Sequence, residues 1–241
     1  MQGKWAGKAA WAGVCVPALI WAVPALAGPP YVTDDPEPTD LHKWEIYNFV
    51  SGSHENGITS ADMGVDLNYG GAKDLQLTAT LPLHVETGSP LGAGDVELAA
   101  KYRFLHQQEG GLLPDVAFFP RVFLPTGRGS TRAQVLLPLW AQKDWGKWSL
   151  FGGGGYTLNP GPGQRNYASM GAALSRQLRP GWQMGLEYYA QTRASEDDRP
   201  VHGLNIGSQV HIAGPFSWLA SFGQGLNRRQ TIFYSSLKLD L

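Results

Sequence analysis

The sequence predicts an all-β protein, namely a transmembrane antiparallel up-and-down β-barrel of about 12 strands. Three observations carry this prediction. Apolar and polar residues alternate with period 2 in one segment after another, as they do in strands with two different faces. Short turns rich in Gly and Pro alternate with longer polar connections. Trp residues recur at one end of the predicted strands.

The composition excludes several other classes of protein. The chain of 241 residues has a formal net charge of -1, with 43% hydrophobic and 16% charged residues. This hydrophobic content argues against a disordered chain. The absence of a basic excess argues against a nucleic-acid partner. A mean hydropathy of -0.21 is too low for a bundle of membrane helices, whereas alternating strands average to such a value.

Residues 1–27 have the pattern of a cleaved secretory signal peptide, with basic residues, an apolar run and the small-x-small site Ala25-Leu26-Ala27. Two Pro residues interrupt the run, which makes a membrane anchor the weaker alternative. The single Cys of the chain is Cys15, so the exported protein would contain no disulfide. We therefore expect export to the bacterial outer membrane.

The exported chain divides into two parts. Residues 28–41 are rich in Pro and Asp and are expected to form an N-terminal periplasmic segment, since Pro-rich chains are extended. Residues 42–241 are expected to form the outer-membrane β-barrel. Two partners follow from this prediction, namely the lipid of the outer membrane and the outer-membrane assembly machinery.

The first four predicted strands begin near residues 43, 60, 74 and 95. In residues 74–86 Leu, Ala and Val fall on one parity, and Asp, Gln, Thr, Pro, His and Glu fall on the other. The next three segments begin near residues 115, 132 and 147 and alternate poorly. Pro120 and Pro138 are expected to weaken the ladder there, because Pro donates no backbone hydrogen bond.

The remaining five strands begin near residues 166, 182, 201, 216 and 230. One parity of residues 182–189 holds Trp, Met, Leu and Tyr, against Gln, Gly, Glu and Tyr on the other. Each segment is about ten residues long, close to the ~9–11 that cross a bilayer as a tilted strand. Twelve is an even number, as single-chain bacterial barrels require, although ten or fourteen strands stay open.

The connections fall into two classes. Those after even-numbered strands are mostly tight turns, such as Gly70–Lys73, and are expected on the periplasmic side. Those after odd-numbered strands, such as Ser51–Thr59 and Ala194–Pro200, are longer and more polar and are expected outside the cell. All six Trp residues beyond the signal peptide lie near the expected periplasmic ends, as an interfacial girdle requires. They are Trp44, Trp140, Trp145, Trp148, Trp182 and Trp218.

A secreted β-sandwich is the alternative, because its strands also alternate. The apolar parity of the clearest strands is nearly free of Lys and Arg. In a barrel those apolar side chains face lipid, and the ionic ones line the bore.

Three motifs resemble those of the phenol meta-pathway degradation-like family of outer-membrane β-barrel proteins. They are the strand Gly94–Phe104 (GDVELAAKYRF), the start Gly28–Pro38 with TDDPEP, and Leu124–Gly127 (LPTG). The resemblance implies an outer-membrane barrel that passes small organic, including aromatic, compounds. One departure is the last residue, Leu241, where an aromatic residue is the commoner ending.

The lumen is the predicted functional surface. The leading hypothesis is a channel that passes small organic, including aromatic, solutes by passive diffusion, and the alternatives are a plugged structural barrel and a membrane-embedded lipid-modifying enzyme. Thr33, Asp34 and Asp35 are expected to fold into the periplasmic mouth as a plug and to pair with Lys101, Arg103 or Arg121. The residues expected to line the pore or bind solute are Asp62, Asp66, Asp74, Gln76, His84, Glu97, Lys101, Arg103, Arg121, Glu187, Asn205 and Gln209.

No enzyme chemistry is expected. Ser53-His54-Glu55 is the nearest approach to a catalytic cluster, and we interpret it as a solvated loop. The six His residues lack the spacing of metal ligands, so neither a metal nor a cofactor is expected.

Overall fold

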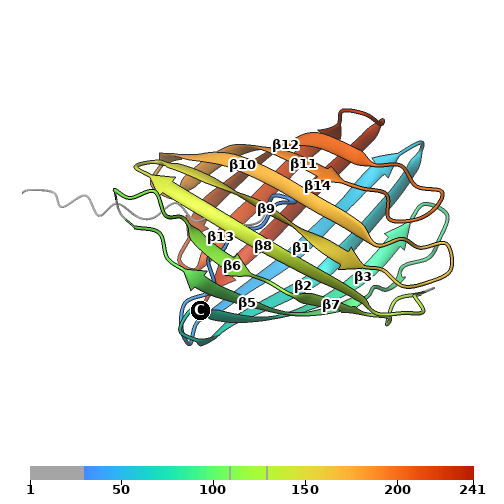
Figure 1. The fold of residues 1–241 in the computed structure, drawn as a ribbon, viewed down its shortest axis with the longest axis horizontal. Helices are drawn as coiled ribbons and strands as arrows, with labels where there is room; N and C mark the ends of the chain where they lie inside the picture. Colours follow the sequence, from blue (N-terminus) through green and yellow to red (C-terminus); the bar gives the residue numbers. More distant parts are fainter. Residues whose placement is uncertain (1–29, 109, 129) are drawn as a thin grey trace, which may run out of the picture.

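The computed structural model describes residues 30–108, 110–128 and 130–241. The expected signal peptide, residues 1–27, lies outside these residues. The described chain forms a closed antiparallel barrel of twelve wall strands, which confirms the predicted fold class (Figure 1). None of the described residues forms a helix that is long and apolar enough to cross a membrane.

Fourteen strand segments make up the twelve wall strands, because β6 and β7 together form one of them and β4 is a two-residue addition to β3. The segments are β1 (Trp44–Glu55), β2 (Ile58–Ala72), β3 (Leu75–Glu86), β4 (Gly92–Ala93), β5 (Val96–Leu105), β6 (Asp115–Phe118), β7 (Arg121–Leu124), β8 (Gln134–Trp145), β9 (Trp148–Leu158), β10 (Tyr167–Arg179), β11 (Trp182–Gln191), β12 (Val201–Ala213), β13 (Phe216–Gly225) and β14 (Gln230–Asp240).

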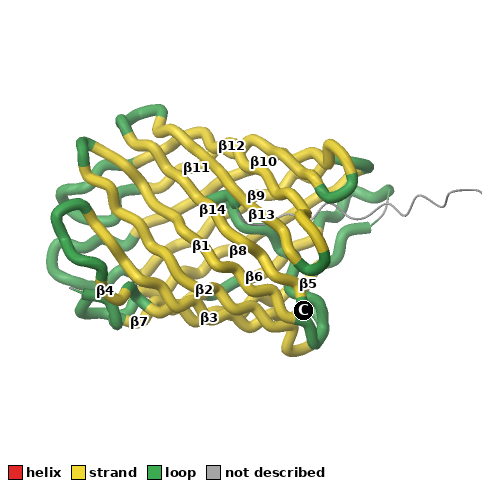
Figure 2. Tube along the Cα trace, turned by 180° about the vertical axis from the view of Figure 1, so that it is seen from behind, coloured by secondary structure: helices red, strands yellow, loops and turns green. Residues whose placement is uncertain are grey.

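The barrel closes between its first and last strands. β1 pairs with β14 over its length, from Glu45 opposite Asp240 to Glu55 opposite Gln230. The other wall strands pair with their neighbours in chain order, which gives the up-and-down topology seen from both sides in Figures 1 and 2. Closure leaves no sheet edge, so the backbone groups of the wall are paired within the protein, as an apolar membrane interior requires.

The wall strand between β5 and β8 is interrupted at Phe119 and Pro120, which separate β6 from β7. Pro138 of β8 lies opposite this break, and its carbonyl accepts the Phe119 N–H at 3.2 Å. The N–H and C=O of a strand residue point to the same neighbouring strand. The N–H that Pro138 lacks would therefore have faced the place where Phe119 and Pro120 already interrupt that strand. The two prolines thus weaken the ladder at one shared place.

Apolar side chains are exposed on the outer surface and ionic side chains are buried inside, as the barrel prediction requires. Leu77 of β3 is 48% exposed on the outer surface, whereas Glu187 of β11 is 0% and Lys238 of β14 is 4% exposed. Apolar side chains outside and ionic groups inside are the reverse of a water-soluble core. The β-sandwich alternative is therefore wrong.

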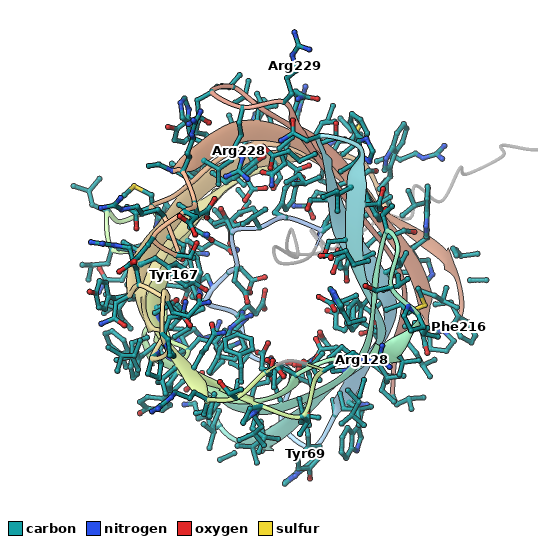
Figure 3. The ribbon with its side chains drawn as sticks, turned by 90° about the vertical axis from the view of Figure 1, so that its right-hand side faces the viewer. Tyr69, Arg128, Tyr167, Phe216, Arg228 and Arg229 are labelled. Atoms are coloured by element: carbon teal, nitrogen blue, oxygen red, sulfur yellow. The ribbon has the colours of Figure 1, made fainter. Side chains whose placement is uncertain are left out.

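Aromatic side chains gather on the outer surface near one end of the barrel. Trp44, Trp145, Trp148 and Trp218 are exposed there, and Figure 3 shows Tyr69 and Phe216 pointing away from the wall. The prediction is wrong for Trp140, which points inward and is only 6% exposed. Trp140 pairs with Gly153 of β9, whose missing side chain leaves room for the indole.

The two ends of the barrel differ, as predicted. The short-turn end carries turns at residues 73–74, 146–147, 180–181 and 214–215 together with the longer 106–114 connection. The long-loop end carries residues 87–95, 125–128, 130–133, 159–166 and 192–200. The predicted loop Ser51–Thr59 is wrong, because β1 and β2 continue to a two-residue turn, Asn56-Gly57. The φ angles of this turn are 51° and 81°, which Asn and Gly tolerate.

Candidate functional site

Residues 30–41, which we call the N-terminal segment, lie inside the barrel and not as a free periplasmic tail. Thr33 is 1% and Asp35 is 3% exposed. Figure 3 looks along the barrel and shows this segment, in blue, within the ring of strands. Pro residues at three of its positions restrict the backbone, so less conformational entropy is lost when it docks.

Glu187 of β11 holds the first part of the N-terminal segment. Its carboxylate accepts the backbone N–H of Val32 at 3.1 Å and of Thr33 at 2.5 Å. Asn205 of β12 donates to the same carboxylate at 2.8 Å. This buried carboxylate, which has no cationic partner among the described residues, is thereby satisfied by three N–H donors, two of them from the N-terminal segment.

Glycines on the inner face of the wall make room for this part of the segment. The Tyr31 hydroxyl donates to the Gly207 carbonyl at 3.1 Å. A Cβ added at Gly207 would lie 2.6 Å from Tyr31 and 2.9 Å from Pro30. A Cβ at Gly185 would lie 2.6 Å from the Tyr31 hydroxyl, and one at Gly171 would overlap the Thr33 hydroxyl. Only glycine allows so close an approach of the segment to the wall.

Asp34 and Asp35 reach the opposite wall. Asp34 pairs with Lys101 of β5 at 3.0 Å and with Arg121 of β7, and Asp35 lies 3.5 Å from Lys101. Burial by itself disfavours both charged carboxylates, but Lys101 and Arg121 outweigh it at Asp34 and hold its pKa below the ordinary value. Burial dominates at Asp35, where it raises the pKa well above the ordinary value. Of the two carboxylates, Asp34 is thus the one whose charged form is favoured by its surroundings.

The segment leaves the lumen at the short-turn end. Gln76 of β3 accepts the Thr39 N–H at 2.8 Å and the Thr39 hydroxyl at 3.0 Å. The N–H of His42 then donates to the Gly70 carbonyl at 2.8 Å, immediately before β1 begins. The segment therefore crosses the bore from the β11–β12 wall to the β5–β7 wall and then to β3.

A cavity of about 480 Å³ remains between the N-terminal segment and the wall. The predicted site residues that line it are Asp66, Gln76, Glu97, Lys101, Arg121, Asn205 and Gln209, together with Thr33, Asp34 and Asp35 of the segment. Lys101 and Arg121 also lie over the Phe119 ring, at 4.8 and 4.2 Å from its centroid. The structure thus brings most of the predicted residues to one place.

Other predicted residues lie elsewhere in the barrel. Asp62 and His84 form a pair at 2.8 Å between β2 and β3, outside the cavity lining. Asp74 pairs with Arg103 at 3.1 Å at the short-turn end. Of the three alternative partners predicted for the N-terminal segment, Lys101 and Arg121 pair with it, whereas Arg103 pairs with the neighbouring Asp74.

The sequence analysis missed the aromatic part of the cavity. Tyr47 and Phe49 of β1 and Tyr234 of β14 line it, together with Lys238. These strands carry apolar residues on both parities, so alternation alone does not separate their inner face from their outer one. Their neighbours Glu45 and Lys238, which pair at 3.1 Å, were the available signal for the inner face.

The described residues contain no constellation for catalysis at Ser53-His54-Glu55. Ser53 and His54 are consecutive in β1 and therefore point to opposite faces of the wall. Glu55 is held by Arg228, from the connection between β13 and β14 at the long-loop end. Within residues 30–108, 110–128 and 130–241, no group of three or more His, Cys, Asp or Glu side chains is placed to hold a metal ion.

A family described as "Putative MetA-pathway of phenol degradation" matches residues 41–237, which is nearly the whole barrel. The chain belongs to this family. The resemblance inferred from the three sequence motifs is thereby confirmed.

Solved structures of other proteins share the fold of this chain. An outer membrane channel from Pseudomonas putida F1 has 17% sequence identity and a TM-score of 0.67, over 86% of this chain and 97% of that one. The KdgM porin, solved in complex with disordered oligogalacturonate, has 9% identity and a TM-score of 0.57, over 81% of this chain and 98% of that one. No curated protein sequence matches the chain. The chain therefore has the fold of outer-membrane channels.

Proposed function

We propose that this protein is an outer-membrane channel through which small organic solutes, aromatic compounds among them, diffuse passively. The single observation that carries the proposal is the cavity of about 480 Å³, lined by ionic, amide and aromatic side chains, inside a closed wall whose outer face is apolar. A closed wall of this kind is stable in a bilayer, and a polar bore gives solutes a path through it. Membership of the family and the fold of outer-membrane channels support the proposal.

The N-terminal segment sets how wide the path is. The bore of a twelve-stranded barrel is wider than that of a barrel of ~8 strands, which side chains can fill, and narrower than that of the open porins with 16–18 strands. The docked segment narrows this bore further, from Pro30 to Thr39. We therefore expect a small conductance and a low size limit for solutes. A plugged barrel with a structural role is the competing function, since the same segment could also close the bore completely.

Liposome swelling tests the proposal. Purified protein is reconstituted into vesicles, and swelling is recorded with sugars of increasing size and with neutral and acidic aromatic solutes. A channel predicts swelling that falls steeply with solute size and includes small aromatic compounds. Vesicles that swell no faster than protein-free ones with every solute would support the plugged barrel instead. The Leu81→Arg variant, which places a charge on the lipid-facing side near the middle of β3, should insert less efficiently and provides the matched control.

A further inference from the structure

One part of the cavity wall places aromatic rings beside a carboxylate. Asp66 of β2 lies directly opposite Tyr47 of β1. Phe49 follows Tyr47 two residues along the same face of β1, and its partner on β14 is Ser236. Tyr234 is therefore the diagonal neighbour of Phe49, within reach of an aromatic side chain. All four side chains belong to residues that line the cavity.

The carboxylate of Asp66 has no cationic partner among the described residues. It accepts hydrogen bonds only from Asn68 at 3.2 Å and from the Thr80 hydroxyl at 2.9 Å. The three cationic side chains in the lining, Lys101, Arg121 and Lys238, are each engaged by carboxylates. Seven carboxylate side chains line the cavity against those three cations. The cavity is therefore acidic, and its unpaired charge lies next to the aromatic wall.

Two further observations indicate which ligand this arrangement suits. Asn205 is fully buried and lines the cavity, and its Oδ1 is an acceptor without a partner in the described structure. Lys238 lies 5.6 Å from the centroid of the Tyr47 ring, so this wall already holds one ammonium group against an aromatic face. Unpaired acceptors, negative charge and aromatic faces all favour a cationic ligand.

We propose that the cavity is a binding site for small organic cations, namely protonated amines and quaternary ammonium compounds that carry an apolar or aromatic group. The ammonium group lies against Phe49 and Tyr234 and next to Asp66, where the carboxylate balances its charge. This inference rests on the proposed channel function, because it names the solutes that the channel retains in its bore.

Calorimetric titration of the purified full-length barrel in detergent measures the site directly and does not depend on conduction. The probes are benzyltrimethylammonium, benzyl alcohol and benzoate, which share a ring and differ in charge. We expect benzyltrimethylammonium to bind at least ~10-fold more tightly than either of the others, from charge balance and cation–π contact together. Asp66→Asn should weaken its binding ~10-fold, and Phe49→Leu ~3-fold or more.

Asp62→Asn is the matched control, because Asp62 lies on the same strand and the same face as Asp66 but outside the cavity lining. It should leave the affinity unchanged. Equal binding of benzoate and benzyltrimethylammonium, or an Asp66→Asn variant that binds the cation as well as the parent, would overturn the inference. Binding without any conductance in bilayers would overturn the channel function and leave the site standing. Conductance without cation binding would do the reverse.

Discussion

Glu187→Gln tests the docking of the N-terminal segment most sharply. The Glu187 carboxylate accepts the N–H groups of Val32 and Thr33 in a fully buried place. Gln keeps the shape but loses the charge, and it turns one acceptor into an N–H₂ donor that faces an N–H. Hydrogen bonds to charged groups contribute ~1.5–3 kcal/mol each, so roughly 3 kcal/mol is lost, or about a 100-fold fall in the ratio of docked to undocked segment.

Hydrogen exchange in detergent or nanodiscs measures this change. The amides of residues 31–35, 37, 39 and 40 should exchange about 100-fold faster in Glu187→Gln, in line with the same ~3 kcal/mol. Those of the barrel strands should stay protected. Glu196→Gln is the control, since Glu196 lies in the loop before β12 and makes no described contact with the segment. Unchanged exchange at Val32 and Thr33 in Glu187→Gln would refute the reasoning. Strands that also lose protection would show that Glu187 supports the wall and not the segment.

Four further predictions concern the segment, the wall and the loops. Gly207→Ala should weaken docking by ~1–3 kcal/mol, measured by the same exchange, because the nearest atoms that a Cβ would meet belong to Pro30 and Tyr31. Asp34→Asn should weaken docking by ~2–3 kcal/mol, which is less than the cost of leaving a buried charge wholly unpaired. Asp35→Asn should leave docking unchanged or make it stronger at pH 7, because burial disfavours the charged form of Asp35 and raises its pKa. The pKa of Asp34 is lowered, so its contribution to docking should be present above about pH 4 and be lost as the pH falls through the lowered pKa. Conductance recorded between pH 7 and 3 should therefore rise as the segment undocks. Glu55→Gln should speed exchange around residues 226–229 without changing solute uptake, because it removes the main partner of Arg228.

Strand alternation predicted the barrel well because the two faces of its wall meet opposite environments. Residues 74–86 and 182–189 have most of their apolar side chains on the lipid side, and the structure orients them accordingly. The error at Ser51–Thr59 arose because polar residues there were taken to indicate a loop, although Asn56-Gly57 is a strong hairpin signal. Trp140 was misplaced because its position in the chain indicates a girdle, whereas its parity, shared with Gln142, indicates the lumen.

The site was predictable in part. Opposite charges on Asp34 and on Lys101 and Arg121 were visible in the sequence, and so was the inward parity of Glu97 and Gln209. That Glu187 captures backbone N–H groups was not predictable, because it depends on where the N-terminal segment crosses the bore. The inward glycines opposite that segment are the signal that a future sequence analysis could use, since small residues on an inner face leave space for a second chain segment.

Site-directed spin labelling tests most directly whether the apolar side chains of the wall face lipid and the polar ones face the bore. The chain from residue 28 onward contains no Cys, so single Cys residues at Ile206 and Gln209 of β12 can be labelled cleanly in vesicles. The label at residue 206 should collide mainly with oxygen dissolved in the bilayer, and the label at residue 209 mainly with a water-soluble nickel chelate. The opposite pattern, or equal access of the nickel chelate to both labels, would contradict the account.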